Sequence, residues 1–158
     1  MLAPIVYLSN PAETSTYQQA PVDTLRAYVD PTLGHQILRS VKATTAVTAK
    51  ELVMYDYVSS DSVVKTTGAN VKACQIAGFA LSSIAAGSYG WVVCSGQAYA
   101  LGHSAMGNGS TLLSASTAGR VDDTTVSTNE HCIVGTSVSN TGWVSAGDTI
   151  TVRVAGLL

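Results

Sequence analysis

Proline is missing from most of this sequence, and glycine is missing from the rest. The four prolines all lie within the first 31 residues: Pro4, Pro11, Pro21 and Pro31. The fourteen glycines run from Gly34 to Gly156. Because proline fixes φ and offers no backbone donor, the first segment favours extended runs that cannot pair inside a central sheet. The sequence therefore predicts an extended N-terminal arm over residues 1–33 and a compact β body over residues 34–158.

Charge is also scarce. Charged residues make up 11% of the chain and hydrophobic residues 46%, whereas an ordinary soluble domain has about 25% charged residues. Few ions would need to be desolvated at an interface, which favours a protein packed against neighbours. A β domain that simply carries Ser and Thr on its surface is the alternative. The net charge is −2 and the basic residues are scattered singly, which argues against nucleic-acid binding.

Long apolar runs and paired cysteines are absent as well. No stretch reaches the roughly 18 apolar residues of a membrane span, so we expect no membrane partner. The apolar opening of the chain has no basic flank and is interrupted by Pro4, which is a poor match to a signal peptide. Cys74, Cys94 and Cys132 are odd in number and widely spaced. We expect free core thiols and synthesis in a reducing cytoplasm.

Short β-favouring runs recur through the body. They are residues 36–41, 52–58, 70–74, 76–81, 90–94, 97–101, 131–138 and 149–154. In the last run Ile150, Val152 and Val154 alternate with polar residues, so one face is buried. This spacing predicts a mainly β fold, a single antiparallel β-sandwich or barrel.

Two of these runs resemble each other. Ile76-Ala77-Gly78-Phe79-Ala80-Leu81-Ser82 aligns with Ile133-Val134-Gly135-Thr136-Ser137-Val138-Ser139. Strands of similar register in related places would explain the match, and so would chance in a chain rich in these residues. In either case Gly78 and Gly135 are expected to mark bulges or close backbone approaches.

The arm contains one short helical pattern and several aromatic residues. Pro21 suits the first turn of a helix that Pro31 would stop, although two turns need a docking surface. Partner-binding anchors, or residues that fold back on their own body, are predicted at Ile5, Tyr7, Leu8, Tyr17, Leu25 and Tyr28.

Catalytic and metal-binding patterns are weak. Gly102-His103-Ser104 begins like a nucleophile elbow, but the second glycine comes one residue too late. A hydrolase centred on Ser104 would need His35 or His131 beside it. The histidines lack metal-ligand spacing, and Asp122-Asp123 is expected to be a solvated loop pair rather than a calcium site. No catalytic residue, cofactor or metal ligand is predicted.

Two tryptophans leave a binding function open. Trp91 and Trp143 lie in β-favouring runs with apolar neighbours. Such residues usually belong to a core, but they could also stack a sugar.

Several pieces of the body match one family. The pieces are Leu33-Gly34, Ser40-Val41-Lys42-Ala43, Ala77-Gly78-Phe79-Ala80, Ile84 through Val92, Ser114 through Gly119, and Ile133-Val134-Gly135. With these pieces, the sequence resembles the small capsid decoration, or cement, proteins of tailed bacteriophages. The most specific piece is Ala85-Ala86-Gly87-Ser88-Tyr89-Gly90-Trp91-Val92, a turn leading directly into a strand.

The resemblance implies a structural protein rather than an enzyme. Such proteins are mostly β, commonly form homotrimers, and bind the major capsid protein on the outer surface of an icosahedral head. It therefore implies a virion location and stabilised contacts between capsid subunits. Two other classes stay open: a sugar-binding β module displayed on a virion, and a β-fold hydrolase using Ser104.

Overall fold

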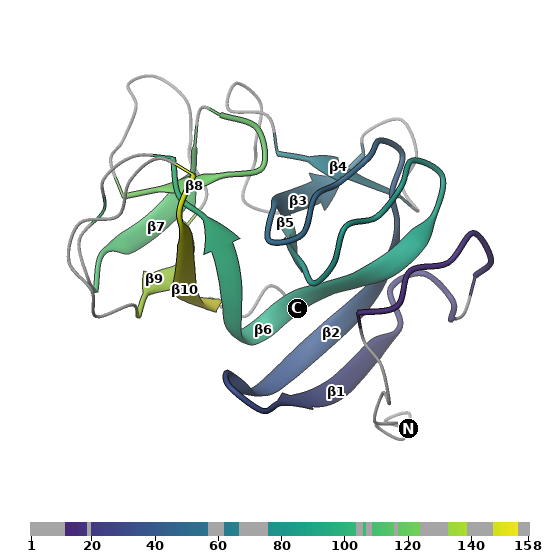
Figure 1. Cartoon of the computed structure of the whole chain (residues 1–158), viewed down its shortest axis with the longest axis horizontal. Coiled ribbons are helices and arrows are strands. Elements are labelled where there is room, and N and C mark those ends of the chain that lie inside the picture. The colour runs from purple at the N-terminus through teal and green to yellow at the C-terminus, as the bar shows by residue number, and fades with distance from the viewer. Residues whose placement is uncertain are drawn as a thin grey trace.

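The protein is all-β in the part of the chain that the structure describes. The computed structural model describes residues 12–18, 20–56, 62–66, 76–103, 106, 109–115, 117–123, 133–138 and 147–154. Within these ranges there is no helix, so none that could cross a membrane. One 10-stranded antiparallel sheet curls into a half-barrel (Figure 1). The predicted antiparallel β fold is confirmed.

The strands vary widely in length. They are β1 (Leu25–Asp30), β2 (Gly34–Lys42), β3 (Leu52–Tyr55), β4 (Val63–Lys65), β5 (Ile76–Ala80), β6 (Tyr89–Leu101), β7 (Thr111–Ser114), β8 (Val121–Asp122), β9 (Ile133–Ser137) and β10 (Thr149–Val154). The order across the sheet is β4-β3-β5-β6-β10-β9-β7-β8, with β2 also on β6 and β1 on β2.

Strand β6 is the centre of this arrangement. Its 13 residues pair with β2, with β5 and with β10. In Figure 1 it runs from the group of β3, β4 and β5 to the group of β7 to β10. The sequence predicted two separate strands here, at residues 90–94 and 97–101. The two runs form one strand because a register shift rather than a turn joins them. Leu38 pairs with Val93 and Ile37 pairs with Ser95, so Cys94 has no partner of its own on β2.

The helix predicted between Pro21 and Pro31 is wrong. Residues Leu25–Asp30 form β1, which pairs antiparallel with β2. Asp30 Oδ1 accepts hydrogen bonds from the backbone N–H of Thr32 and Leu33, both at 2.8 Å, and this closes the turn into β2. A two-turn helix would gain little, whereas a strand satisfies its backbone on β2. Residues 25–30 of the predicted arm therefore belong to the body's own sheet.

The pairing pattern occurs twice along the chain. In the first repeat, residues 36–95, β3 pairs with β4 and β5, and β5 pairs with β6. In the second repeat, residues 96–154, β7 pairs with β8 and β9, and β9 pairs with β10. The first half of β6 ends the first repeat, and its second half opens the second, where it pairs with β10.

The isolated bridges repeat too. Ala43 forms a parallel bridge with Val63, and Gly102 forms one with Val121. Each bridge links the outermost strand of its repeat, β4 or β8, to the residue that directly follows the first strand of that repeat, β2 or β6. The short sequence match between residues 76–82 and 133–139 is therefore part of a full structural repeat.

Gly78 and Gly135 occupy equivalent bulges, as predicted. The β3–β5 register skips Ala77, and the β7–β9 register skips Val134. A Cβ on Gly78 would overlap the carbonyl oxygen of Val93 on β6, and a Cβ on Gly135 would overlap that of Arg153 on β10. Each repeat therefore needs a residue without a side chain where its bulged strand meets the next strand.

Two core clusters lie on opposite faces of the sheet. The second core cluster fills the first repeat and consists of Val41, Ala43, Val47, Val53, Val63, Ala77, Ala80, Ile84 and Val92. The first core cluster joins the other face of that repeat, including Leu38, Phe79, Trp91 and Val93, to the interior of the second repeat, including Ala100, Leu112, Val134 and Val152. The first core cluster therefore contains side chains of both repeats, and each repeat buries part of its apolar surface against the other.

We predict that Gly78→Ala lowers the free energy of unfolding by about 2–3 kcal/mol, because alanine adds a backbone clash and a strained φ. Gly78 has φ +147°, and the overlapping atom belongs to a central strand. Gly87→Ala is the matched control: its φ is +78° but nothing lies within 4 Å of the added Cβ. It should cost about 1 kcal/mol. Equal losses in denaturant titrations would contradict the close-approach argument.

Candidate partner-binding surface

The N-terminal segment is fixed to the body at Ser15. Ser15 and Tyr89 form an antiparallel bridge, with N···O distances of 3.1 and 2.8 Å. The backbone groups of Tyr89 that bond Ser15 point away from β2, which faces Tyr89 through Lys42. The segment therefore runs along the edge of β6 that lies opposite β2.

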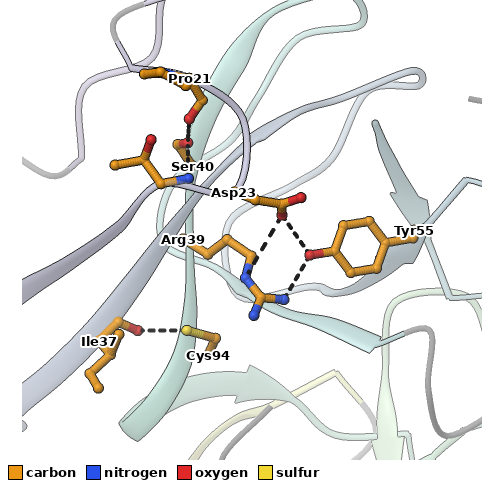
Figure 2. A network of polar contacts seen from close by, with 8 residues as sticks. Pro21, Asp23, Ile37, Arg39, Ser40, Tyr55 and Cys94 are labelled. Atoms are coloured by element: carbon orange, nitrogen blue, oxygen red, sulfur yellow. Dashed lines mark hydrogen bonds and ion pairs between the residues drawn. The ribbon is translucent and has the colours of Figure 1, made fainter. Parts of the chain in front are cut away.

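A second attachment lies just before β1. The Ser40 hydroxyl donates to the carbonyl of Pro21 (Figure 2), and the Asp23 N–H donates to the Ser40 carbonyl at 2.9 Å. Ser40 is 6% exposed. Its hydroxyl, at a buried position on β2, also accepts the Thr24 N–H at 3.2 Å and so links the Pro21 carbonyl to the residue just before β1.

A polar triad completes this attachment. The Tyr55 hydroxyl donates to Asp23 Oδ1 at 2.6 Å, and Arg39 Nη1 donates to the Tyr55 oxygen at 2.7 Å (Figure 2). Arg39 Nε lies 3.9 Å from Asp23 Oδ1. Burial, followed by the hydrogen bond to Asp23, raises the pKa of Tyr55 to about 12. The triad joins the turn before β1 to β2 and β3.

The Cys94 thiol is a core residue, as predicted. It is fully buried and donates to the Ile37 carbonyl at 3.3 Å, at the register shift in β6 (Figure 2). Burial raises the pKa of Cys94, which disfavours the reactive thiolate. Cys74 and Cys132 lie outside the described residues.

The predicted anchors fall into three groups. Tyr17 is 81% exposed and Leu25 is 46% exposed, so both side chains are available to a partner. Tyr28 packs against the first core cluster instead. Ile5, Tyr7 and Leu8 lie outside the described residues.

Val29 is an exposed apolar residue that the sequence analysis did not select. It is 45% exposed and shares one face of β1 with Leu25 and Ala27. The alternation of Leu25, Ala27 and Val29 was the available signal, but the helical interpretation of this segment hid it. The candidate partner-binding surface therefore has two parts: the face of β1 with Leu25, Ala27 and Val29, and Tyr17 on the N-terminal segment.

The residues considered for chemistry do not converge in the described part of the chain. Within it, no group of three His, Cys, Asp or Glu side chains could hold a metal ion. Ser104 and His131 lie outside the described ranges. The expectation of a solvated Asp122 is wrong: Asp122 is 2% exposed and ends β8, and its Oδ1 accepts the Asp123 N–H at 2.8 Å.

Trp91 is a core residue. It is 4% exposed and belongs to the first core cluster, so its ring is not available to stack a sugar. Trp143 lies outside the described residues. The core interpretation of Trp91 is confirmed.

Comparison with known proteins gives one structural likeness. No protein-family model matches the sequence, and no curated protein matches it. Among solved structures, the fold is similar to "The crystal structure of head fiber gp8.5 N base in bacteriophage phi29", with a TM-score of 0.50 and 16% sequence identity. The match covers 75% of this chain and 92% of that chain. At this identity the likeness is one of fold.

We predict that the Asp23–Tyr55–Arg39 triad makes stability fall at high pH. The raised pKa of Tyr55 means that the fold favours the neutral phenol, whose usual pKa is 10.0. Its contribution is present below pH 10 and is lost as the pH rises from 10 towards 12. Tyr55→Phe should lower the free energy of unfolding at pH 8 by about 1 kcal/mol and flatten the alkaline decrease. Urea titrations from pH 8 to 11.5 measure both effects, and an unchanged alkaline decrease would contradict the assignment to Tyr55.

Proposed function

We propose that this protein is a structural component of a tailed-phage head. It binds the outside of the icosahedral shell as a decoration, or cement, protein and stabilises contacts between major capsid subunits. It has no enzymatic role. The observation that carries the proposal is the fold likeness to the base of the phi29 head fiber, which covers 92% of that base.

The composition of the described surface supports an assembly role. Its exposed large hydrophobic residues are Tyr17, Leu25, Val29, Tyr99 and Ile133. Two salt bridges are formed among the described side chains, Arg39–Asp23 and Lys65–Glu51. A surface of this kind loses little free energy when neighbouring proteins cover it, because few charges must be desolvated.

The partners in this proposal are the major capsid protein and further copies of this chain, with three copies in one unit. A specific contact buries about 1,200–2,000 Å² in total. A trimer that contacts the shell through all three copies gains avidity without a larger contact for each copy.

The base of a projecting head fiber is a second candidate, because the similar solved structure is such a base. The two candidates differ in what binding does to the shell. A cement protein should raise the temperature at which filled heads release DNA. A fiber base should bind without that shift.

Tyr17 gives the sharpest test of the binding surface. We predict that Tyr17→Ser weakens co-sedimentation with tailed-phage heads lacking this protein about tenfold, since a buried tyrosine anchor contributes roughly 1.4 kcal/mol or more. Tyr17 is 81% exposed, so the variant should fold normally. Tyr99→Ser is the matched control, with a tyrosine on β6 that is 38% exposed.

The wild-type protein should sediment with heads, whereas the fold monitored by circular dichroism should be the same for both variants. Failure of the wild-type protein to bind any head of its phage would overturn the proposed function. Equal weakening by Tyr17→Ser and Tyr99→Ser would instead show that the surface has been placed wrongly.

A further inference from the structure

Strand β1 has an open edge. Among the described strands, β4 and β8 end the sheet order, but each is bridged on its outer side, by Ala43 and Gly102 respectively. Strand β1 pairs with β2 along all six residues and has no described neighbour on its other side. This edge is therefore the longest unpaired stretch of strand in the described sheet.

The backbone groups on that edge can be assigned from the pairing. The Ser40 N–H donates to the Thr24 carbonyl at 3.0 Å, so Thr24 and Ser40 form a hydrogen-bonded pair. Alternate residues of an antiparallel strand point to opposite neighbours. Arg26 and Tyr28 therefore bond β2, whereas Leu25, Ala27 and Val29 direct their N–H and C=O groups to the open edge.

The usual protections of an exposed edge are weak here. Natural edges carry lysine, proline or a bulge that blocks pairing with other chains. Strand β1 has no lysine, proline or bulge in residues 25–30, and its register with β2 is unbroken. Its two charged residues, Arg26 and Asp30, are at positions whose backbone groups bond β2, so no charged residue lies at a position that faces the open edge. Leu25 and Val29 are 46% and 45% exposed on the same face. An edge with these properties is stable in solution when another strand covers it.

We propose that residues 5–10 of a neighbouring copy cover this edge as an added strand. This proposal deepens the proposed function, on which its trimeric form rests, by naming the contact that joins the copies. The added strand pairs with Leu25, Ala27 and Val29 and places its apolar side chains beside Leu25 and Val29.

The sequence of this segment suits the role. Pro4 and Pro11 bracket six residues that all have backbone donors, Ile5-Val6-Tyr7-Leu8-Ser9-Asn10. Six residues is also the length of β1. The first four are β-branched, aromatic or aliphatic, which favours a strand with apolar side chains on both faces. The prolines end the pairing at each side because they lack the donor.

The place where the segment leaves the body favours a neighbour over its own chain. Ser15 is bonded to the edge of β6 opposite β2, so the lateral order is β1, β2, β6 and Ser15. Three strand spacings, about 14 Å, separate Ser15 from β1. To reach its own β1, the segment would have to cross the face of β2 and β6. The link from Ser15 back to Asn10 spans about 17 Å when extended, less than the four strand spacings, about 19 Å, from Ser15 to the outer side of its own β1, which favours the β1 edge of another copy.

The exchange is a head-to-tail contact, because the arm of one copy meets the β1 edge of the next. Such contacts form a closed ring when the rotation between copies closes. Three copies would form a ring in which each β1 edge is covered and each arm is used. This closure also prevents open-ended growth through the exposed edges.

Ala27→Pro tests the contact without removing β1. The Ala27 N–H faces the open edge, so proline removes a donor to the added strand and leaves the bonds to β2 intact. The wild-type protein should have about three times the 16.3 kDa mass of one chain by light scattering, and Ala27→Pro should reduce that mass threefold. Deleting residues 1–11 should have the same effect, whereas Ala27→Ser should keep the wild-type mass. A trimer that survives both Ala27→Pro and the deletion, or a monomeric wild type, overturns the proposal.

Cysteine pairs show which copy supplies the strand. Val29→Cys is combined in turn with Val6→Cys, Tyr7→Cys and Leu8→Cys, and the purified proteins are oxidised. At least one pair should give linked species of two and three chains on a non-reducing gel, and reduction should remove them; single variants should give none. Links confined within one chain, or no link from any pair, would overturn exchange between copies.

These measurements use the protein alone, so they are separate from head binding. A trimer joined by its arms that fails to bind heads would refute the proposed function and keep the exchange. A protein that binds heads but whose copies are not joined through residues 5–10 and β1 would refute the exchange and keep the proposed function.

Discussion

The hydrogen bonds along both edges of β6 hold this structure together. One edge pairs with β2 from Tyr89 to Gly96, and the other pairs with β5 and then with β10. Each repeat therefore uses part of the same strand, and neither can complete its sheet without it. The first core cluster has the same property, since it contains residues of both repeats. We expect the two repeats to unfold together for this reason.

The two repeats have the same pairing but different outer faces. Leu38, Phe79 and Val93 of the first repeat are buried in the shared core. By register, their equivalents in the second repeat are Gln97, Thr136 and Arg153, of which Thr136 and Arg153 are exposed. The same sheet face is therefore buried in the first repeat and partly exposed to solvent in the second. Polar Gln97, Thr136 and Arg153 therefore stand in the second repeat where the first repeat has Leu38, Phe79 and Val93.

The sequence predicted what depends on local pattern and missed what depends on distant pairing. Alternation at Ile150, Val152 and Val154, and the special role of Gly78 and Gly135, follow from strand geometry and are present. Short strands such as β4 and β8 have three and two residues, too few to show a period, and exist because β3 and β7 pair with them. Strand β1 was missed because the flanking Pro21 and Pro31 suit a helix start and stop, whereas its partner β2 decides its conformation. The sequence left open whether Tyr17, Leu25 and Tyr28 are exposed or fold back on the body; exposure of the first two and partial burial of Tyr28 follow from the positions that the sheet gives them.

The same physical property explains both the arm and the edge it is proposed to cover. Proline confines continuous pairing to the stretches between prolines: Pro4 and Pro11 bracket residues 5–10, and β1 lies within the run between Pro21 and Pro31. In the described structure one of these runs is a strand with a satisfied inner edge and an open outer edge. An open edge with exposed leucine and valine is a hazard for a monomer and an advantage for a protein that functions in an assembly. The unpaired edge of β1, with Leu25 and Val29 exposed beside it, is therefore the feature of the described structure that best suits contact with a neighbouring protein.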